Sequence, residues 1–245
     1  LNLDIRHVAF SATSKFDGQR IRPLMPHELA QIAGRAGRYM QPGTFGVTGE
    51  ASPLEDGLVE AIQSHAFKPI DRLMWRNDRL DFGSPEALIA SLEAPSTELQ
   101  LTKGREADDL SSLKTLNQLE TVAVRLRDAR DVKLLWEVCR IPDFQGISHG
   151  EHTTMLARIF GFLHERGRVD GDWFARQVKR IDRTDGDIDM LSKRLAYIRT
   201  WTYVAQRKGW VDNDAHWRDA TRAIEDRLSD ALHQALTNRF VDRRT

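Results

Sequence analysis

The 245-residue chain carries 36 basic and 36 acidic residues, so no net charge draws it toward nucleic acid or an anionic membrane. Its one cysteine excludes an internal disulfide framework. No apolar run reaches the ~18 residues of a membrane span, and no secretory signal opens the chain. Because it starts with Leu1 and stops without tailing off, we expect an excerpt from a longer polypeptide.

The first fifty residues predict a strand, a hairpin, a helix and a second strand. Residues 5–13 are rich in β-branched and aromatic side chains, as strands are. Turn residues at 15–18 and a second arm at 19–23 predict the hairpin. Pro26 suits the first turn of a helix, and residues 44–49 again read as a strand. This order is typical of the end of an α/β lobe.

The helix that follows Pro26 is predicted to have two unlike faces. Its apolar face, at 3.6-residue spacing, comprises Leu29, Ile32, Ala33 and Ala36. The opposite face comprises Gln31, Arg35 and Arg38. Gly34 and Gly37 remove side chains there and let another group approach the backbone. Guanidinium groups presented in this way suit a phosphate chain, although an ordinary amphipathic helix with a solvated basic face is the alternative.

The spacing Q-x-x-G-R-x-G-R over residues 31–38, after the segments 1–6 and 8–10, resembles the sixth motif of superfamily 2 helicases of the DExH type, preceded by the tail of the fifth. The resemblance implies a second RecA-like lobe that contacts ATP, with Mg²⁺ as a further cofactor. Arg38, with Arg35 as the second candidate, would act as an arginine finger. Asn2 would couple the nucleotide to the nucleic-acid strand. The nucleotide site implied in this way comprises Asn2, Gln31, Gly34, Arg35, Gly37 and Arg38.

The hairpin is similar to one that DExH helicases use near a duplex junction, and a plain surface hairpin is the alternative. Basic side chains here and in the last helices are candidates for neutralising RNA phosphates. The candidates are Lys15, Arg20, Arg199, Arg207 and Lys208, and along another helix Lys179, Arg180 and Arg183. Such charges are also common on solvated helix faces beside acids, so both interpretations stay open.

The rest of the chain is predicted to be helical. Ser84 and Pro85 mark a helix start, and the polar stretch 97–112 indicates a linker or mobile loop. Apolar residues at helical spacing then predict six helices, the first over residues 113–126. We therefore expect a mainly α chain with a truncated α/β part, the remnant of a RecA-like second lobe. The expected domains are 1–52 for the lobe, 53–112 for a helical transition and linker, and 113–245 for a helical domain.

Two C-terminal segments, 191–201 and 222–244, resemble the mitochondrial degradosome RNA helicase group and its bacterial relatives. This implies a 3′-to-5′ RNA helicase with an exoribonuclease as a candidate partner, in the bacterial cytoplasm or the mitochondrial matrix, and no membrane. The phosphate loop and the Mg²⁺-binding acids are not in the sequence, so the chain alone should be inactive without its first RecA-like lobe. A DNA helicase of the same superfamily, or a helical adaptor that binds RNA or a nuclease, is the alternative.

For the remaining histidine, cysteine and tryptophan residues, the sequence favours mainly structural roles. His149, Glu151 and His152 are too few for a zinc site without a second cluster, so no metal is expected and a solvated helix start is the preferred interpretation. Cys139 follows Trp136 at helical spacing and is predicted to be a buried small hydrophobe. Tryptophans can stack on bases. Core packing is preferred for Trp173, Trp201 and Trp217, but not for Trp210.

Overall fold

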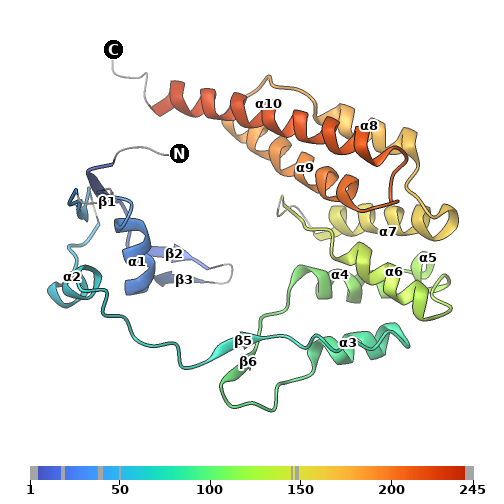
Figure 1. Ribbon diagram of the computed structural model, residues 1–245, viewed down its shortest axis with the longest axis horizontal. Helices are drawn as coiled ribbons and strands as arrows, with labels where there is room; N and C mark the ends of the chain where they lie inside the picture. The colour runs from blue at the N-terminus through green and yellow to red at the C-terminus, as the bar shows by residue number, and fades with distance from the viewer. Residues whose placement is uncertain are drawn as a thin grey trace. The chain divides into compact units, whose positions relative to one another are not determined.

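The computed structural model describes residues 5–17, 20–37, 41–49, 51–144, 146 and 149–240. It divides into an N-terminal unit, Leu1–Asp71, and a helical unit, Arg72–Thr245 (Figure 1). This division differs from the expected boundaries after residues 52 and 112. Within the described residues no helix is both long and apolar enough to cross a membrane.

The N-terminal unit contains a parallel strand pair, a hairpin and two helices. Its elements are β1 (His7–Phe10), β2 (Ser14–Phe16), β3 (Ile21–Pro23), α1 (Pro26–Ala33), β4 (Thr44–Val47) and α2 (Asp56–Gln63). Strands β1 and β4 pair in parallel, with His7 opposite Thr44 and Phe10 opposite Val47. The chain therefore leaves β1, forms the hairpin and α1, and returns beside the strand it left.

The hairpin is present, but its arms differ from the prediction. Strands β2 and β3 pair antiparallel, with Phe16 opposite Ile21. Lys15 and Phe16 therefore lie in the first arm rather than in the turn. The apolar stretch expected as one strand to Thr13 ends at Phe10, because β1 pairs with β4 and not with the hairpin.

A small core holds the N-terminal unit together, and α1 supplies most of it. Its buried residues are Phe10, Leu29, Ala30, Ala33 and Ile62. Ile32, which was assigned to the buried face of α1, is 39% exposed. Leu29 and Ala33 are buried as predicted, and Ala30 takes the place of Ile32 in the core.

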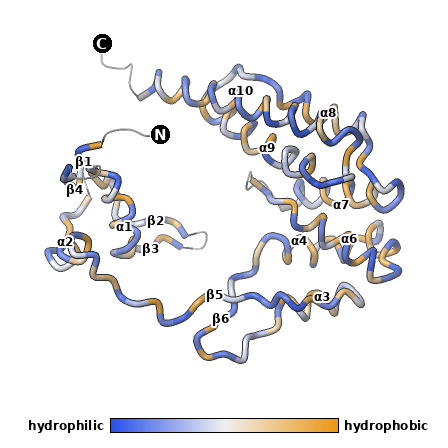
Figure 2. The backbone as a smooth tube through the Cα atoms, viewed as in Figure 1, coloured by the Kyte–Doolittle hydropathy of each residue, from blue (hydrophilic) through white to orange (hydrophobic). Residues whose placement is uncertain are grey.

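The helical unit begins with a short parallel strand pair and continues as helices. Its elements are β5 (Leu73–Trp75), α3 (Pro85–Glu93), β6 (Leu101–Lys103), α4 (Asp108–Asn117), α5 (Glu120–Ala123), α6 (Ala129–Cys139), α7 (His149–Arg166), α8 (Gly171–Ile181), α9 (Ile188–Gln206) and α10 (Asp214–Phe240). One core runs through these helices. Figure 2 shows hydrophobic and hydrophilic residues alternating along α9 and α10, which pack against each other.

Side-chain caps fix several helix starts. Ser84 Oγ accepts a hydrogen bond from the Ala87 N–H at 3.1 Å, and Pro85 occupies the first turn as predicted. Asp170 caps α8 by accepting a hydrogen bond from the Trp173 N–H at 2.8 Å. Asp187 caps α9 in the same way through Met190.

Two segments differ from the sequence prediction. The stretch 97–112 is not a linker, because Leu101–Lys103 pairs with β5 and α4 starts at Asp108. Asp108 and Asp109, taken as linker charges, stabilise the first turn of α4 through the helix dipole. The single helix expected over 113–126 is two, α4 and α5, separated at Gln118 and Leu119.

Candidate functional site

The arginine segment starts on α1 but leaves the helix before its first arginine. Helix α1 ends at Ala33, and the Gly34 N–H donates to Ala30 O at 2.8 Å. Two i→i+3 bonds continue the turn, from Arg35 N–H to Ile32 O and from Ala36 N–H to Ala33 O. The prediction that one helix face carries all three polar residues is therefore wrong. Arg38 and Asn2 lie outside the described residues.

Gln31 and Arg35 are both exposed, one turn apart along the chain. Within the part of the chain that the structure describes, the Arg35 guanidinium has no carboxylate partner. Each of the two exposed side chains matches phosphate oxygens chemically, because the amide and the guanidinium both donate hydrogen bonds and the guanidinium is cationic.

Gly37 approaches a neighbour closely, but the neighbour is its own chain. Its φ is +80°, and a Cβ there would lie 2.6 Å from both Gln41 O and Gly43 N. A Cβ on Gly43 would in turn lie 2.2 Å from the Ala36 carbonyl carbon. The two glycines thus let two backbone segments pack against each other. This self-contact, rather than a ligand, accounts for the glycine at position 37.

The hairpin is joined to α1 through one carboxylate. Glu28 accepts from Arg22 Nη1 and Nη2 at 2.8 Å each, from Lys15 Nζ at 2.7 Å and from the Met25 N–H at 2.8 Å. The Arg22 and Lys15 hydrogen bonds hold the pKa of Glu28 far below its usual range. Lys15 and Arg20, both predicted RNA contacts, are exposed, but Lys15 is paired with Glu28.

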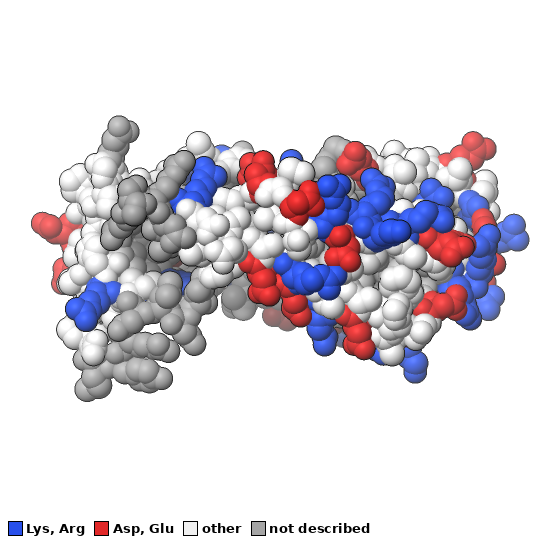
Figure 3. Space-filling model, turned by 90° about the horizontal axis from the view of Figure 1, so that it is seen from above, with Lys and Arg blue, Asp and Glu red and all other residues white. Residues whose placement is uncertain are grey.

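Among the basic candidates of the helical unit, some are paired with carboxylates and others are exposed. Arg199 Nε donates to Glu225 Oε1 at 3.0 Å. Arg207 forms an ion pair with Glu137 and lies 5.1 Å from the ring centroid of Trp210. Lys208 is exposed. Trp210, expected to be free for base stacking, packs against the core instead. Figure 3 shows acidic and basic side chains interspersed over the helical unit.

The histidine and cysteine candidates have structural surroundings. His152 is buried, 7% exposed, and its Nε2 lies 3.1 Å from Ile141 O, so the expected solvated helix start is wrong for this residue. The described ranges hold no group of three metal-ligating side chains. Cys139 is buried, as predicted, and burial raises the pKa of its thiol.

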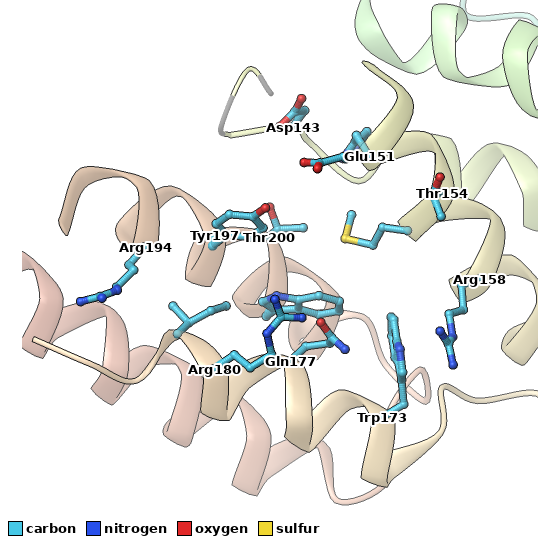
Figure 4. A pocket seen from close by; sticks show the side chains of 14 residues that line it. Asp143, Glu151, Thr154, Arg158, Trp173, Gln177, Arg180, Arg194, Tyr197 and Thr200 are labelled. Carbon is cyan, nitrogen blue, oxygen red and sulfur yellow. The ribbon is translucent and has the colours of Figure 1, made fainter. Parts of the chain in front are cut away.

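Sequence reasoning missed a cavity of about 500 Å³ lined by residues of α7, α8 and α9 (Figure 4). Trp173 and Trp201 were assigned correctly to the core, yet they also line this cavity. Its polar lining includes Gln177, Arg180 and Tyr197. Gln177 and Arg180 stand four and seven positions after Trp173, which is the one signal in the sequence that places them on a shared helix face.

Comparison with known proteins gives one short match. No family model matches the chain, and no solved structure matches it. A segment of 46 residues, 19% of the chain, is 46% identical to the DExH-box ATP-dependent RNA helicase DExH16, mitochondrial, of Arabidopsis thaliana. The match spans only 8% of that relative's length. This similarity supports a helicase relationship for part of the chain.

Proposed function

We propose that this chain is part of an ATP-dependent RNA helicase of the DExH type, comprising the end of the second RecA-like lobe and a helical domain. The observation that carries the proposal is Arg35, an exposed guanidinium without a carboxylate partner among the described residues, inside the segment Gln31–Arg38. The 46-residue similarity to a DExH-box RNA helicase supports the same assignment.

The residues of this segment suit a triphosphate. The Gln31 amide donates hydrogen bonds to phosphate oxygens, and Arg35 offers a planar fork that carries positive charge. Arg38, from the same motif, is the proposed arginine finger, and it stabilises the negative charge that builds on the γ-phosphate. When ATP and Mg²⁺ are bound, they supply the phosphoanhydride bond and its activation. The phosphate loop and the Mg²⁺-binding acids belong to a lobe outside this sequence.

RNA as the substrate, 3′-to-5′ direction and a link to RNA degradation are the finer parts of the proposal. They are supported by the C-terminal segments 191–201 and 222–244, which resemble degradosome helicases. An exoribonuclease is the partner that such a helicase would supply with unwound RNA. The similarity to an RNA helicase favours RNA over DNA.

The test uses the longer protein that includes the region upstream of Leu1. Arg38→Ala and Arg35→Ala should each lower RNA-stimulated ATP hydrolysis, by about 10³-fold for the finger. Arg176→Ala, on an exposed part of α8, serves as the matched control and should leave the rate unchanged. The 245-residue chain alone should release no phosphate.

ATP turnover that survives both substitutions in the arginine segment would remove the nucleotide role. An upstream coding region without a phosphate loop and a DExH-like acidic box would overturn the helicase assignment and leave the adaptor interpretation. Equal stimulation by single-stranded DNA and RNA would remove the RNA preference.

A further inference from the structure

The cavity between α7, α8 and α9 has one rigid aromatic wall. Trp173 and Trp201 are 6% and 3% exposed, and their ring centroids lie 5.4 Å apart in an edge-to-face arrangement. The Arg158 guanidinium lies 5.4 Å from the Trp173 ring. Met155 of α7 also lines the cavity. This wall is built from buried side chains, so it is preformed rather than assembled by a ligand.

Polar side chains from two helices of the cavity are available to a ligand. Gln177 and Arg180, from α8, and Tyr197, from α9, make no hydrogen bond or ion pair within the described part of the chain. Arg194 differs, because it points away in Figure 4 and donates to Arg183 O at 2.8 Å. A cation, an amide and a phenol thus remain available next to the aromatic wall.

Charge is divided between two sides of the cavity. Figure 4 shows Asp143 and Glu151 on one side, and Gln177 and Arg180 on the other. A ligand that fits this division carries an anionic group at one end and hydrogen-bond donors at the other. A nucleotide has this character, since its phosphate is anionic and the Watson–Crick edge of its base carries N–H donors, the N3–H in uracil, that can donate to carboxylates. A volume of about 500 Å³ lies within the range of small-molecule sites.

We propose that this cavity binds one unstacked nucleotide of single-stranded RNA. The base packs against Tyr197 and the tryptophan wall, the Gln177 amide contacts its edge, and Arg180 contacts the phosphate. Aromatic stacking and phosphate neutralisation are the two interactions on which single-strand sites depend. That the nucleotide belongs to RNA rests on the proposed function, whereas the match between a nucleotide and the cavity does not depend on it. The cavity would therefore hold the strand in the helical unit, independently of ATP.

The test measures binding of a fluorescein-labelled oligouridylate to the 245-residue chain by anisotropy, without ATP. Tyr197→Ala should weaken binding roughly 5- to 150-fold, the range found for loss of one stacked base. Arg180→Gln should lower the slope of log K against log salt by about 0.7, because one phosphate contact is lost. Arg176→Gln is the matched control, since it makes the same charge change on the same helix at an exposed residue that does not line the cavity.

Cross-linking locates the ligand directly. An oligonucleotide with one 4-thiouridine, irradiated in near-ultraviolet light, should attach within α7 at Met155 or within α9 at Tyr197. Circular dichroism should show all variants folded, since Arg180 is exposed and Tyr197 is 36% exposed. The proposal would be overturned if the chain did not bind the oligonucleotide at low salt or if all variants bound it equally well. Cross-links found only outside the cavity would also overturn it, as would a peptide found to occupy the cavity.

This outcome is separate from that of the helicase assignment. Loss of RNA binding in Tyr197→Ala, together with ATP turnover that ignores Arg35 and Arg38, would support the cavity and remove the nucleotide site. The reverse pattern would remove the cavity and support the helicase.

Discussion

Arg22 of β3 and Glu28 of α1 form a two-point contact, with both guanidinium Nη atoms 2.8 Å from the carboxylate oxygens. Lys15 of β2 reaches the same carboxylate at 2.7 Å. Both arms of the hairpin are therefore tied to the helix that precedes Arg35. A bidentate guanidinium–carboxylate pair fixes orientation as well as distance, so the hairpin and α1 should move together.

Glu28→Gln should loosen the hairpin, because the amide keeps one acceptor oxygen but loses the charge that attracts Arg22 and Lys15. We expect amide hydrogen exchange at Leu24, whose N–H donates to Thr13 O, to rise roughly 2- to 5-fold. Glu60→Gln, on the exposed face of α2, is the control and should not change it. Unchanged exchange in Glu28→Gln would mean that strand pairing alone holds the hairpin.

The same carboxylate predicts an acid-sensitive contact. Its folded-state pKa is lowered from the ordinary value of 4.5, chiefly by Arg22. The stabilisation is therefore fully present above the unfolded pKa and is lost as pH falls below about 4.5 toward the folded pKa. Hydrogen exchange at Leu24, corrected for its intrinsic pH dependence, should accelerate in that range in the wild type. It should not do so in Glu28→Gln.

Gly37→Ala should destabilise the N-terminal unit by roughly 1–3 kcal/mol, because φ is +80° and the added methyl group meets Gln41 O and Gly43 N at 2.6 Å. Gly57→Ala is the control, since no atom lies within 4 Å of its added Cβ in α2, and it should be neutral or stabilising by up to ~1 kcal/mol. The stability of both variants is measured by urea denaturation, with hydrogen exchange at the amides of β1 as the signal for unfolding. Equal effects would show that the turn adapts to a side chain.

Arg207→Ala should lower the stability of the helical unit by about 1 kcal/mol, because it removes the ion pair with Glu137 and the guanidinium above Trp210. Lys208→Ala, at the exposed neighbouring position, should leave stability unchanged. Urea denaturation of the helical unit distinguishes them. If Arg207 were chiefly an RNA contact, its substitution would weaken oligouridylate binding and leave the unfolding midpoint unchanged.

Cys139 should not react with iodoacetamide in the folded chain at mildly alkaline pH. The thiol is 2% exposed and burial raises its pKa, so neither access nor thiolate is available. Alkylation should appear only in guanidinium chloride. Ser52→Cys, at an exposed position, should be modified at once and controls for the reagent. Rapid modification of native Cys139 would contradict the packing of α6.

Helix starts that are set by neighbouring residues in the sequence could be predicted. Ser84 with Pro85 gave a helix start, since a cap and a fixed φ act within one turn. The break between α4 and α5 was not predicted, because Leu116 and Leu119 keep the apolar spacing through it. The pairing of β5 with β6 was missed for a similar reason. Three-residue strands are too short to show an alternating pattern.

The candidate site was predictable only as a set of residue types. The Gln31–Arg38 motif is visible in the sequence, but the close approach of the Gly37 and Gly43 backbones depends on the fold. The partners of Lys15 and Arg207 were also not predictable, because Glu28 and Glu137 reach them through the fold. The cavity needs three helices in place before it exists.

The hydrogen bond from the Gly37 N–H to Ile5 O, 2.7 Å long, has a mechanical consequence. Thr44 N–H donates to Arg6 O at 3.0 Å, so the turn after Arg35 and the start of β4 are both fastened to the residues that lead into β1. A pulling force on the residues that precede β1 would therefore act through this hydrogen bond on the turn between Arg35 and Gly37, without first bending α1.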